Sequence, residues 1–350
     1  MPVTIRDVAK AAGVSPSTVS RTIRNNPAIS KATKLKVRAA MEEVGYVPPF
    51  SDESESHEPP MEVDIILPPS QTDTYNNPFF LEVIRGISEY CNQNGAMTAL
   101  ITGKDDQEVI DSILSSQSPD VVSSYILLFS RAGDPIIRFL YSQGLDYVLI
   151  GSASEYSNET VSVDNDNIEA GRCAAQYLYE RGHRRFCFIG APFSNLFSAA
   201  RRNGFLLFLN EKNIPQEQID LIETEHGNES GQEKIRRVLQ RDDATRPTAF
   251  VTSDDMHALT LRQLAADAGL DIPNDVSIVS FNNSIFARLT SPALTSIEVH
   301  PFQLGREAAA QAISRAKTPS PMASKTLVPF ALIQRDSTCY RTPEGSERKD

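Results

Sequence analysis

The sequence predicts an α/β protein: an N-terminal helix-turn-helix headpiece followed by a core of two doubly wound, parallel-sheet subdomains. Capped apolar patterns with helical spacing fill the first 50 residues. From Val63 onward, short apolar runs alternate with helical patterns, which is typical of parallel sheets covered by helices. The 350 residues exceed one ordinary domain and suffice for a headpiece and a large core.

The first helix of the headpiece is predicted from its N-terminal cap. Thr4 and Asp7 have the spacing of a capping box, in which each side chain bonds to the other's backbone N–H. Gly13 ends the helix in a tight turn. The apolar stripe of this helix is Ile5, Val8, Ala9 and Ala12.

Two further helices follow. Ser15 caps the second, Pro16 fits its first turn, and Ser17, Thr18 and Arg21 project from it. The third helix is capped near Ser30 and ends at Gly45. Its predicted buried stripe is Val37, Ala40, Met41 and Val44.

The charge of the headpiece indicates contact with phosphates. The first 50 residues hold eight Lys and Arg against three acidic residues, a net charge of +5, whereas the whole chain carries −11. Such asymmetry suits nucleic acid binding at one end, with the second helix in a major groove. The alternative is a small helical bundle with a solvated basic face.

Seven apolar runs are the predicted strands of the core: Val63–Leu67, Met97–Ile101, Tyr125–Phe129, Tyr147–Ile150, Phe186–Ile189, Ala249–Thr252 and Ser277–Ser280. A helix is expected between the first two, with Asn77 as its cap, Pro78 at its first position and Gly95 at its end. In sheets of this kind ligands bind beyond the carboxyl ends of the strands.

Several classes of protein are excluded by missing signals. The chain has no phosphate-binding Gly-rich loop, no G-x-S-x-G elbow and no paired His–carboxylate motif, so we expect no catalytic residues and no enzyme. The four cysteines and five histidines are scattered without metal-ligand spacing, and we expect no metal and no cofactor. No signal peptide and no membrane-spanning apolar run is present, which favours a cytoplasmic protein without a membrane partner.

The run Ile5-Arg-Asp-Val-Ala-Lys-Ala-Ala-Gly-Val-Ser-Pro-Ser-Thr-Val-Ser-Arg21 resembles the headpiece of the lac repressor/gal repressor family of bacterial transcription regulators. Further matching segments are Arg201–Phe205, Ser253–Asp254, Ser277–Asn282, Pro292–Ile297 and Val328–Arg335. The resemblance implies a periplasmic-binding-protein-like core crossed by three chain passes. It also implies a homodimer on a pseudo-palindromic operator.

The resemblance also gives the expected domain boundaries. The headpiece is residues 1–47, an acidic linker in the hinge position is 48–62, the effector-binding and dimerisation core is 63–340, and a polar tail is 341–350. Within the core, the N subdomain is expected at about 63–161 plus 292–320, and the C subdomain at about 162–291 plus 321–340. The crossings are expected near Val161–Val163, near Thr290–Pro292 and near residues 319–325.

Within the family, the chain most resembles the maltose-operon repressors of Gram-positive type. The segments that indicate this are Tyr75–Phe80, Arg85–Ser88, Thr102–Asp105 and Val163–Asn167. The expected effector is therefore maltose or a related glucoside.

A sugar presents apolar C–H faces and a ring of hydroxyls, so its site needs aromatic platforms and bidentate polar groups. Tyr75 and Phe79 are candidate platforms, although a place in the core is equally open for both; Phe80 is expected in the core. The candidate polar groups are Asp164, Arg201, Asp254 and Asn282. Asp254 has capping of the next helix as its alternative role, and Asp164 has fixing of the hinge as its alternative role.

Seven headpiece residues are candidates for DNA contact. Pro16 and Ser17 match the positions that choose bases in the family, and Arg21 can form a bidentate contact to guanine or clamp a phosphate. The others are expected to position phosphates: Thr4, Ser15, Thr18 and Asn25.

The hinge segment departs from the family pattern. Family members place an Asn-x-x-Ala-Arg-x-Leu-like segment here, whose Leu wedges into the minor groove, whereas this chain has Glu55 at the position of the Leu and Glu53 near that of the Arg. Its Ser-, Glu- and Pro-rich composition predicts a flexible linker and weaker or more salt-dependent operator binding. The alternative is a linker that folds on DNA with Phe50 as the wedge.

Together these observations predict a sequence-specific DNA-binding regulator, a repressor released from its operator by a maltose-like sugar. Two alternatives stay open: the same regulator answering another sugar or a sugar phosphate, and a sugar-binding protein whose DNA binding the atypical hinge weakens.

Overall fold

The computed structural model describes residues 3–23, 29–46, 60–69, 76–118, 121–318 and 322–341. The chain forms two compact units, Met1–Glu58 and Pro59–Asp350, and each has its own apolar core. No helix in these described ranges is long and apolar enough to cross a membrane.

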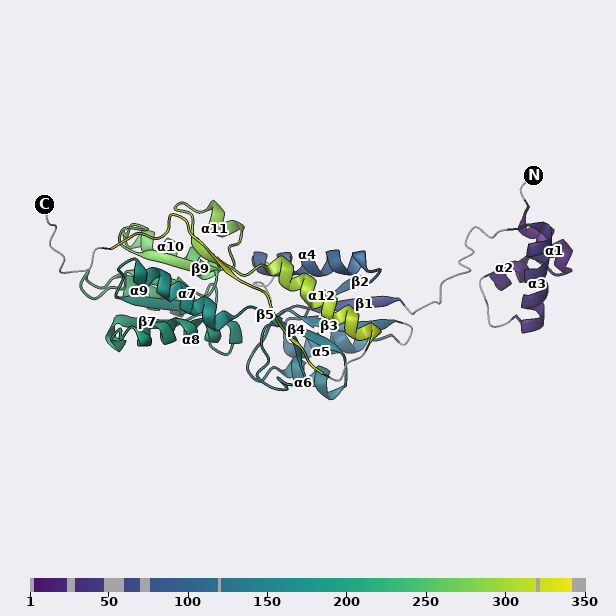
Figure 1. Ribbon diagram of the computed structural model, residues 1–350, viewed down its shortest axis with the longest axis horizontal. Helices are drawn as coiled ribbons and strands as arrows, with labels where there is room; N and C mark the ends of the chain where they lie inside the picture. The colour runs from purple at the N-terminus through teal and green to yellow at the C-terminus, as the bar shows by residue number, and fades with distance from the viewer. Residues whose placement is uncertain are drawn as a thin grey trace. The chain divides into compact units, whose positions relative to one another are not determined.

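The headpiece consists of three helices, α1 (Ile5–Ala12), α2 (Pro16–Ile23) and α3 (Lys31–Val44), as the sequence predicts (Figure 1). Their apolar stripes meet in one small core, in which the buried residues are Val8, Ala9, Ala12, Val19, Val37 and Ala40.

The predicted caps of the headpiece helices are confirmed. Thr4 and Asp7 form the capping box, with the Thr4 backbone N–H donating to Asp7 at 2.8 Å. Gly13 and Gly45 end α1 and α3 in the left-handed conformation, which only glycine adopts without strain. Ser30 caps α3 by accepting from the backbone of Thr33. Local signals alone therefore specify this unit.

The larger unit contains two six-stranded sheets with similar topology. The first has the order β11-β5-β4-β3-β1-β2 and is parallel throughout. Its elements are β1 (Met61–Ile66), α4 (Pro78–Gln93), β2 (Met97–Ile101), α5 (Asp106–Ser116), β3 (Val122–Leu127), α6 (Pro135–Ser142), β4 (Tyr147–Ile150), β5 (Val161–Asp164), α12 (Pro301–Lys317) and β11 (Lys325–Leu327).

The second sheet has the order β12-β10-β9-β8-β6-β7, and only β12 is antiparallel to its neighbour. Its elements are α7 (Asn167–Glu180), β6 (Phe186–Gly190), α8 (Leu196–Glu211), the short 3₁₀ helix η2 (Gln216–Gln218), β7 (Ile219–Glu223), α9 (Glu229–Leu239), β8 (Ala249–Thr252), α10 (Asp255–Asp267), β9 (Ser277–Phe281), α11 (Ile285–Leu289), β10 (Thr295–Glu298) and β12 (Ala331–Ile333).

All seven predicted strands are present, within a few residues of their predicted ends. Five more strands complete the sheets and were not predicted: β5, β7, β10, β11 and β12. Most of these are three or four residues long, and only two of the five residues of β7 are buried, so none presents a continuous apolar run of the kind that marks the central strands.

The predicted subdomain boundaries were wrong at all three crossings. β5 belongs to the first sheet, so the chain first crosses between Asp164 and Asn167, not at 162. β10 pairs with β9 in the second sheet, which moves the second crossing from 290–292 to between Glu298 and Pro301. β11 pairs with β5, so the third crossing follows Leu327 instead of lying within 319–325. Strand pairing, which is long-range, decides these boundaries.

One buried side chain joins the three crossings. The amide nitrogen of Asn165, on the first crossing, donates to the carbonyl oxygen of Val299 at 3.1 Å and to that of Val328 at 2.8 Å. Val299 and Val328 lie on the second and third crossings. Because a buried amide left without partners is costly, Asn165 holds the three passes in one arrangement.

Each subdomain also contains a helix pair packed backbone to backbone at glycine. α4 lies against α12 in the first subdomain, and α7 against α8 in the second (Figure 1). A Cβ on Gly86 would collide with the carbonyl of Phe302, and a Cβ on Gly171 with the carbonyl of Arg201. Only glycine allows this approach, which fixes the position of α8 and of the arginine that it carries.

Candidate functional site

The exposed start of α2 presents a group of linked hydroxyls. Ser15 caps the helix by accepting from the backbone of Thr18 at 3.1 Å, and its hydroxyl lies 2.8 Å from those of Ser17 and Thr18. Pro16 occupies the first helical position, and both it and Ser17 are exposed. Hydroxyls and free N–H groups at a helix start are suited to phosphate and base contact.

The remaining headpiece candidates have different surroundings. Arg21 is exposed on α2, four residues after Ser17 and therefore on the same face of the helix. Thr4 is exposed, but its hydroxyl already donates to Asp7 at 2.7 Å. Asn25 lies outside the described residues, as does the acidic segment 47–59. The roles predicted for them stay predictions.

Arg201 on α8 is the central charged group of the core. It is 4% exposed, and its Nε donates to Asn167 at 2.8 Å while Nη1 donates to the carbonyl of Ser253 at 2.5 Å. The other terminal nitrogen makes no hydrogen bond to the described residues. The guanidinium carbon lies 4.3 Å from the ring centroid of Phe281, a cation–π distance. The side chain is thus fixed while one donor edge remains available.

The charge of Arg201 is preserved by the carboxylates around it. Burial lowers the pKa of Arg201 to about 10, and Asp254, Asp164 and Asp255 oppose this by attraction. The guanidinium is therefore positive at neutral pH.

Asn167 connects Arg201 to the first crossing. Its oxygen accepts from Arg201, and its nitrogen donates to Asp164 Oδ1 at 2.9 Å. The same oxygen of Asp164 accepts from the backbone of Asn165 at 2.8 Å. Burial raises the pKa of Asp164 to about 6, although the Asn165 backbone and the charge of Arg201 lower it. Two predicted residues, Asp164 and Arg201, are thus joined through one that was not predicted.

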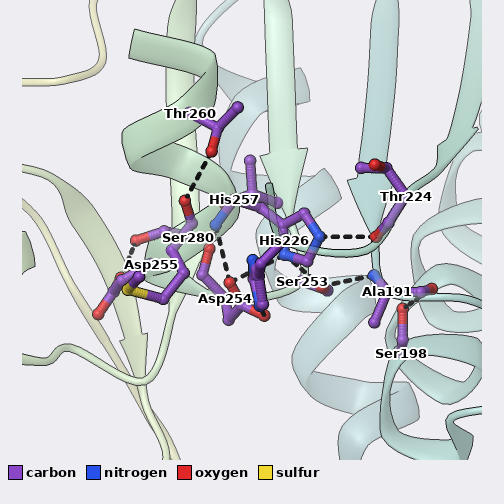
Figure 2. Close-up of polar contacts among 12 residues, drawn as sticks. Ala191, Ser198, Thr224, His226, Ser253, Asp254, Asp255, His257, Thr260 and Ser280 are labelled. Atoms are coloured by element: carbon purple, nitrogen blue, oxygen red, sulfur yellow. Dashed lines mark hydrogen bonds and ion pairs between the residues drawn. The ribbon is translucent and has the colours of Figure 1, made fainter. Parts of the chain in front are cut away.

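Asp254 follows β8 and caps α10, as its alternative role predicted. It is 3% exposed and accepts from the backbone of His257 at 2.8 Å. Its Oδ1 also lies 2.9 Å from His257 Nδ1, and its Oδ2 lies 3.4 Å from His226 Nε2 (Figure 2). Burial by itself raises the pKa of Asp254, but the two facing rings hold it well below its usual value.

Asn282 lies at the bend after β9. Its φ is +90°, and that of the next residue, Asn283, is +46°. Asn283 is engaged, donating to Glu298 at 2.8 Å and accepting from Arg335 at 2.5 Å. Within the described ranges the side chain of Asn282 makes no hydrogen bond, so both halves of its amide are available to a ligand.

The aromatic candidates have different surroundings. Phe79, on α4, packs against the apolar cores of both subdomains, and its ring lies edge-on to that of Phe80 at 5.4 Å. Phe80 packs against the first core only, as expected. Tyr75 lies outside the described residues, so its role stays a prediction.

Comparisons with known proteins agree with this architecture. Residues 4–49 match the description "Bacterial regulatory proteins, lacI family", and residues 175–338 match "Periplasmic binding protein-like domain". The regulator MalR of Staphylococcus xylosus is 30% identical over 338 residues, covering 96% of this chain and 98% of that protein.

Two solved structures are similar as well. A probable maltose operon transcriptional repressor, malR, of Staphylococcus aureus is 25% identical with a TM-score of 0.71, covering 79% of this chain and 97% of that one. A complex of the transcriptional regulator CelR with cellobiose is 26% identical with a TM-score of 0.70, covering 96% of this chain and 99% of that one.

The class defined by this fold is that of ligand-controlled DNA-binding regulators. The chain belongs to the LacI family of bacterial regulatory proteins, whose members are transcription regulators and not enzymes. The alternative of a protein that only binds sugar has no support among these relatives.

Proposed function

We propose that this chain is a transcription repressor whose operator complex is released by maltose or a related glucoside. The observation that carries the proposal is the buried, charged side chain of Arg201, which is held by Asn167 and the Ser253 carbonyl with one donor edge left over. A guanidinium edge can bind two adjacent sugar hydroxyls in a bidentate manner.

The residues around Arg201 supply the complementary groups. Asp164 has a carboxylate oxygen beyond the one that Asn165 and Asn167 occupy, and Asn282 has an unoccupied amide. We place Phe79 as an apolar platform for a sugar face, with Tyr75 as a second. Asp254 lines the same region, although His226 and His257 already engage its oxygens.

Charge favours a neutral sugar over a sugar phosphate. The positive charge of Arg201 is opposed by three carboxylates, those of Asp164, Asp254 and Asp255. A phosphate dianion would meet more repulsion than attraction there, whereas neutral hydroxyls can donate to the carboxylates and accept from the guanidinium.

The descriptions of two structural relatives support a disaccharide as the effector. A neighbour of known structure bears the description maltose operon repressor, and another is solved with cellobiose, a disaccharide. Their cores align with most of this chain. A disaccharide of glucose is therefore the effector class that we propose, with maltose as first choice. We further propose that the chain acts as a homodimer on its operator.

The test is a calorimetric titration of the full chain with maltose, maltotriose, cellobiose and glucose 6-phosphate. We expect heat with maltose or maltotriose and none with the sugar phosphate. If only cellobiose binds, maltose is the wrong effector, but the proposed site for a neutral disaccharide stands. Binding of only the sugar phosphate would refute the proposal that the site is built for a neutral glucoside.

A further inference from the structure

Two histidines from distant parts of the chain converge on Asp254. His226 lies in the loop between β7 and α9, and His257 is in the first turn of α10. Their ring centroids are 4.0 Å apart with an interplanar angle of 46°. The nearest ligand-type atoms of His226, Asp254 and His257 all lie within 4.8 Å of one another (Figure 2).

We propose that His226, Asp254 and His257 bind a divalent transition metal ion of the Zn²⁺ type, with at least one coordination position left open. Two imidazole nitrogens and one carboxylate oxygen suit zinc and its first-row neighbours, whereas Mg²⁺ and Ca²⁺ require mostly oxygen ligands. Three protein ligands with an open position are the pattern of zinc sites that bind a further molecule.

The distances are close to those that zinc needs. Ligand atoms about 2.0–2.2 Å from a tetrahedral ion lie roughly 3.4 Å from one another. The separation of Asp254 Oδ2 from His226 Nε2 is 3.4 Å, and that of Asp254 Oδ1 from His257 Nδ1 is 2.9 Å. Small side-chain rotations therefore suffice to bring the three ligands around one ion.

The surroundings of His257 fit a metal ligand. Its Nε2 lies 3.0 Å from the carbonyl oxygen of Thr224, which can only accept, so the hydrogen is on Nε2. A backbone carbonyl that holds the far nitrogen of a ligating histidine is the usual outer contact of such sites. Without an ion, Nδ1 donates its hydrogen to Asp254 Oδ1 at 2.9 Å. A metal ion would replace that proton and bind both the lone pair of Nδ1 and the carboxylate.

The site has a route from solvent, and Arg201 does not occupy its carboxylate. Asp254 and His257 are buried, but the side chain of His226 is 26% exposed. Arg201 does not compete for the carboxylate, because its hydrogen bonds go to Asn167 and the Ser253 carbonyl. The three ligands lie beyond the carboxyl ends of β7 and β8, so the open position faces the edge where parallel sheets bind small molecules.

A bound ion would tie the loop after β7 to the start of α10. Because the ion binds the folded chain only, it should raise the melting temperature by mass action. This inference is independent of the sugar proposal, since it concerns metal binding in the absence of sugar. Failure of either proposal leaves the other intact.

The experiment uses the full chain without a histidine tag, treated with chelator and titrated with Zn²⁺ by calorimetry. Co²⁺ serves as a second probe, because its visible spectrum reports the number and geometry of its ligands. We expect one ion per chain, a Co²⁺ spectrum of low coordination number, and a higher melting temperature with Zn²⁺.

Three variants make the test specific. His226→Gln, at a partly exposed position, and His257→Gln should each weaken Zn²⁺ binding by about 100-fold or more. The control is His300→Asn, which removes an exposed histidine outside the cluster and keeps a residue that tolerates its φ of +53°. Should His257→Gln fail to fold, His226→Gln decides alone. Absence of stoichiometric binding, or binding that survives in His226→Gln, would overturn the proposal.

Discussion

The buried carboxylates of the two subdomains have different surroundings. In the first subdomain Asp64 lies in the middle of β1 and Asp134 caps α6, whereas in the second Asp254 and Asp255 follow the carboxyl end of β8. Asp64 has one weak hydrogen bond, from Ser116 at 3.3 Å, and its other oxygen has no partner among the described residues. Asp255 accepts from the backbone of Ser284 at 2.7 Å and from two serine hydroxyls.

The two sheets have nearly the same topology, so topology does not explain this difference. Asp254 and Asp255 are held by several donors, and so is Asp134, which accepts from the backbone of Ile136 and from Arg131. Asp64 is the exception. The first subdomain carries a carboxylate that burial and Glu62 disfavour, raising the pKa of Asp64 to about 6. In the effector site that we propose, the polar groups come mainly from the second subdomain, while the first would contribute Asp164 and aromatic surface.

The largest expected effect is on sugar binding. Arg201→Ala should cost about 4 kcal/mol of sugar binding free energy, because two charge-assisted hydrogen bonds to hydroxyls are lost. Calorimetry should then detect no binding, while Arg201→Lys, which keeps the charge without the bidentate edge, retains part of it. Unchanged sugar affinity in a folded Arg201→Ala variant would show that the guanidinium of Arg201 does not bind the sugar.

Asp255→Ala should destabilise the core by about 3 kcal/mol, because the backbone N–H of Ser284 and the hydroxyls of Ser280 and Ser296 lose a buried acceptor. Urea denaturation at pH 7 measures this. Asp255→Asn, which retains one acceptor oxygen, serves as the milder control. If Asp255→Ala lowers the free energy of unfolding by less than about 1 kcal/mol, Asp255 does not stabilise the core, and its difference from Asp64 is lost.

Asp64→Asn should have the opposite sign and stabilise the core by about 2 kcal/mol at pH 8. A carboxyl whose pKa rises from 3.8 to about 6 on folding favours the neutral form. Its contribution to stability is therefore full below pH 3.8 and is lost as the pH rises through 6. The gain from Asn should shrink toward zero near pH 4.

Denaturant melts from pH 4 to 8 provide the measurement, and Asp111→Asn, at an exposed position of α5, is the control without a pH-dependent gain. A gain from Asp64→Asn that does not change with pH would mean that the charge of Asp64 is not its cause.

The smallest expected change in free energy is that of operator binding when one headpiece residue is replaced. Arg21→Ala should weaken operator binding by about 1 kcal/mol, and a loss nearer 3 would indicate a bidentate contact to guanine. Fluorescence anisotropy with operator DNA measures it, and sugar affinity of the variant in solution should equal that of the unaltered chain. A change in sugar affinity would contradict the separation of the two sites.

The headpiece could be predicted from sequence almost residue by residue. Its caps and stops are local signals: the box of Thr4 with Asp7, the serine before each following helix, and the left-handed Gly13 and Gly45. The central strands of the core were equally clear because they are continuous apolar runs. The five short strands β5, β7, β10, β11 and β12 and the three crossings were not, since pairing between distant segments decides them.

The candidate site was predictable in part for the same reason. Asp254 stands at the start of α10 directly after a strand, a place where ligand contacts are expected, whereas Arg201 is the sixth residue of α8. Asn167 connects Arg201 to Asp164 only through the folded chain, and His226 meets His257 from 31 positions away. One local signal was available: His257 lies three residues after Asp254, within reach of its cap.

The central claim is that a neutral glucoside bound at Arg201 releases the operator. The most direct measurement is operator affinity of the full chain, with and without maltose, for the unaltered protein and for Arg201→Ala. We predict that saturating maltose weakens operator binding of the unaltered protein by about 10-fold or more and leaves the variant unaffected. Equal operator affinity with and without maltose, together with a decrease caused by a sugar phosphate, would contradict the account.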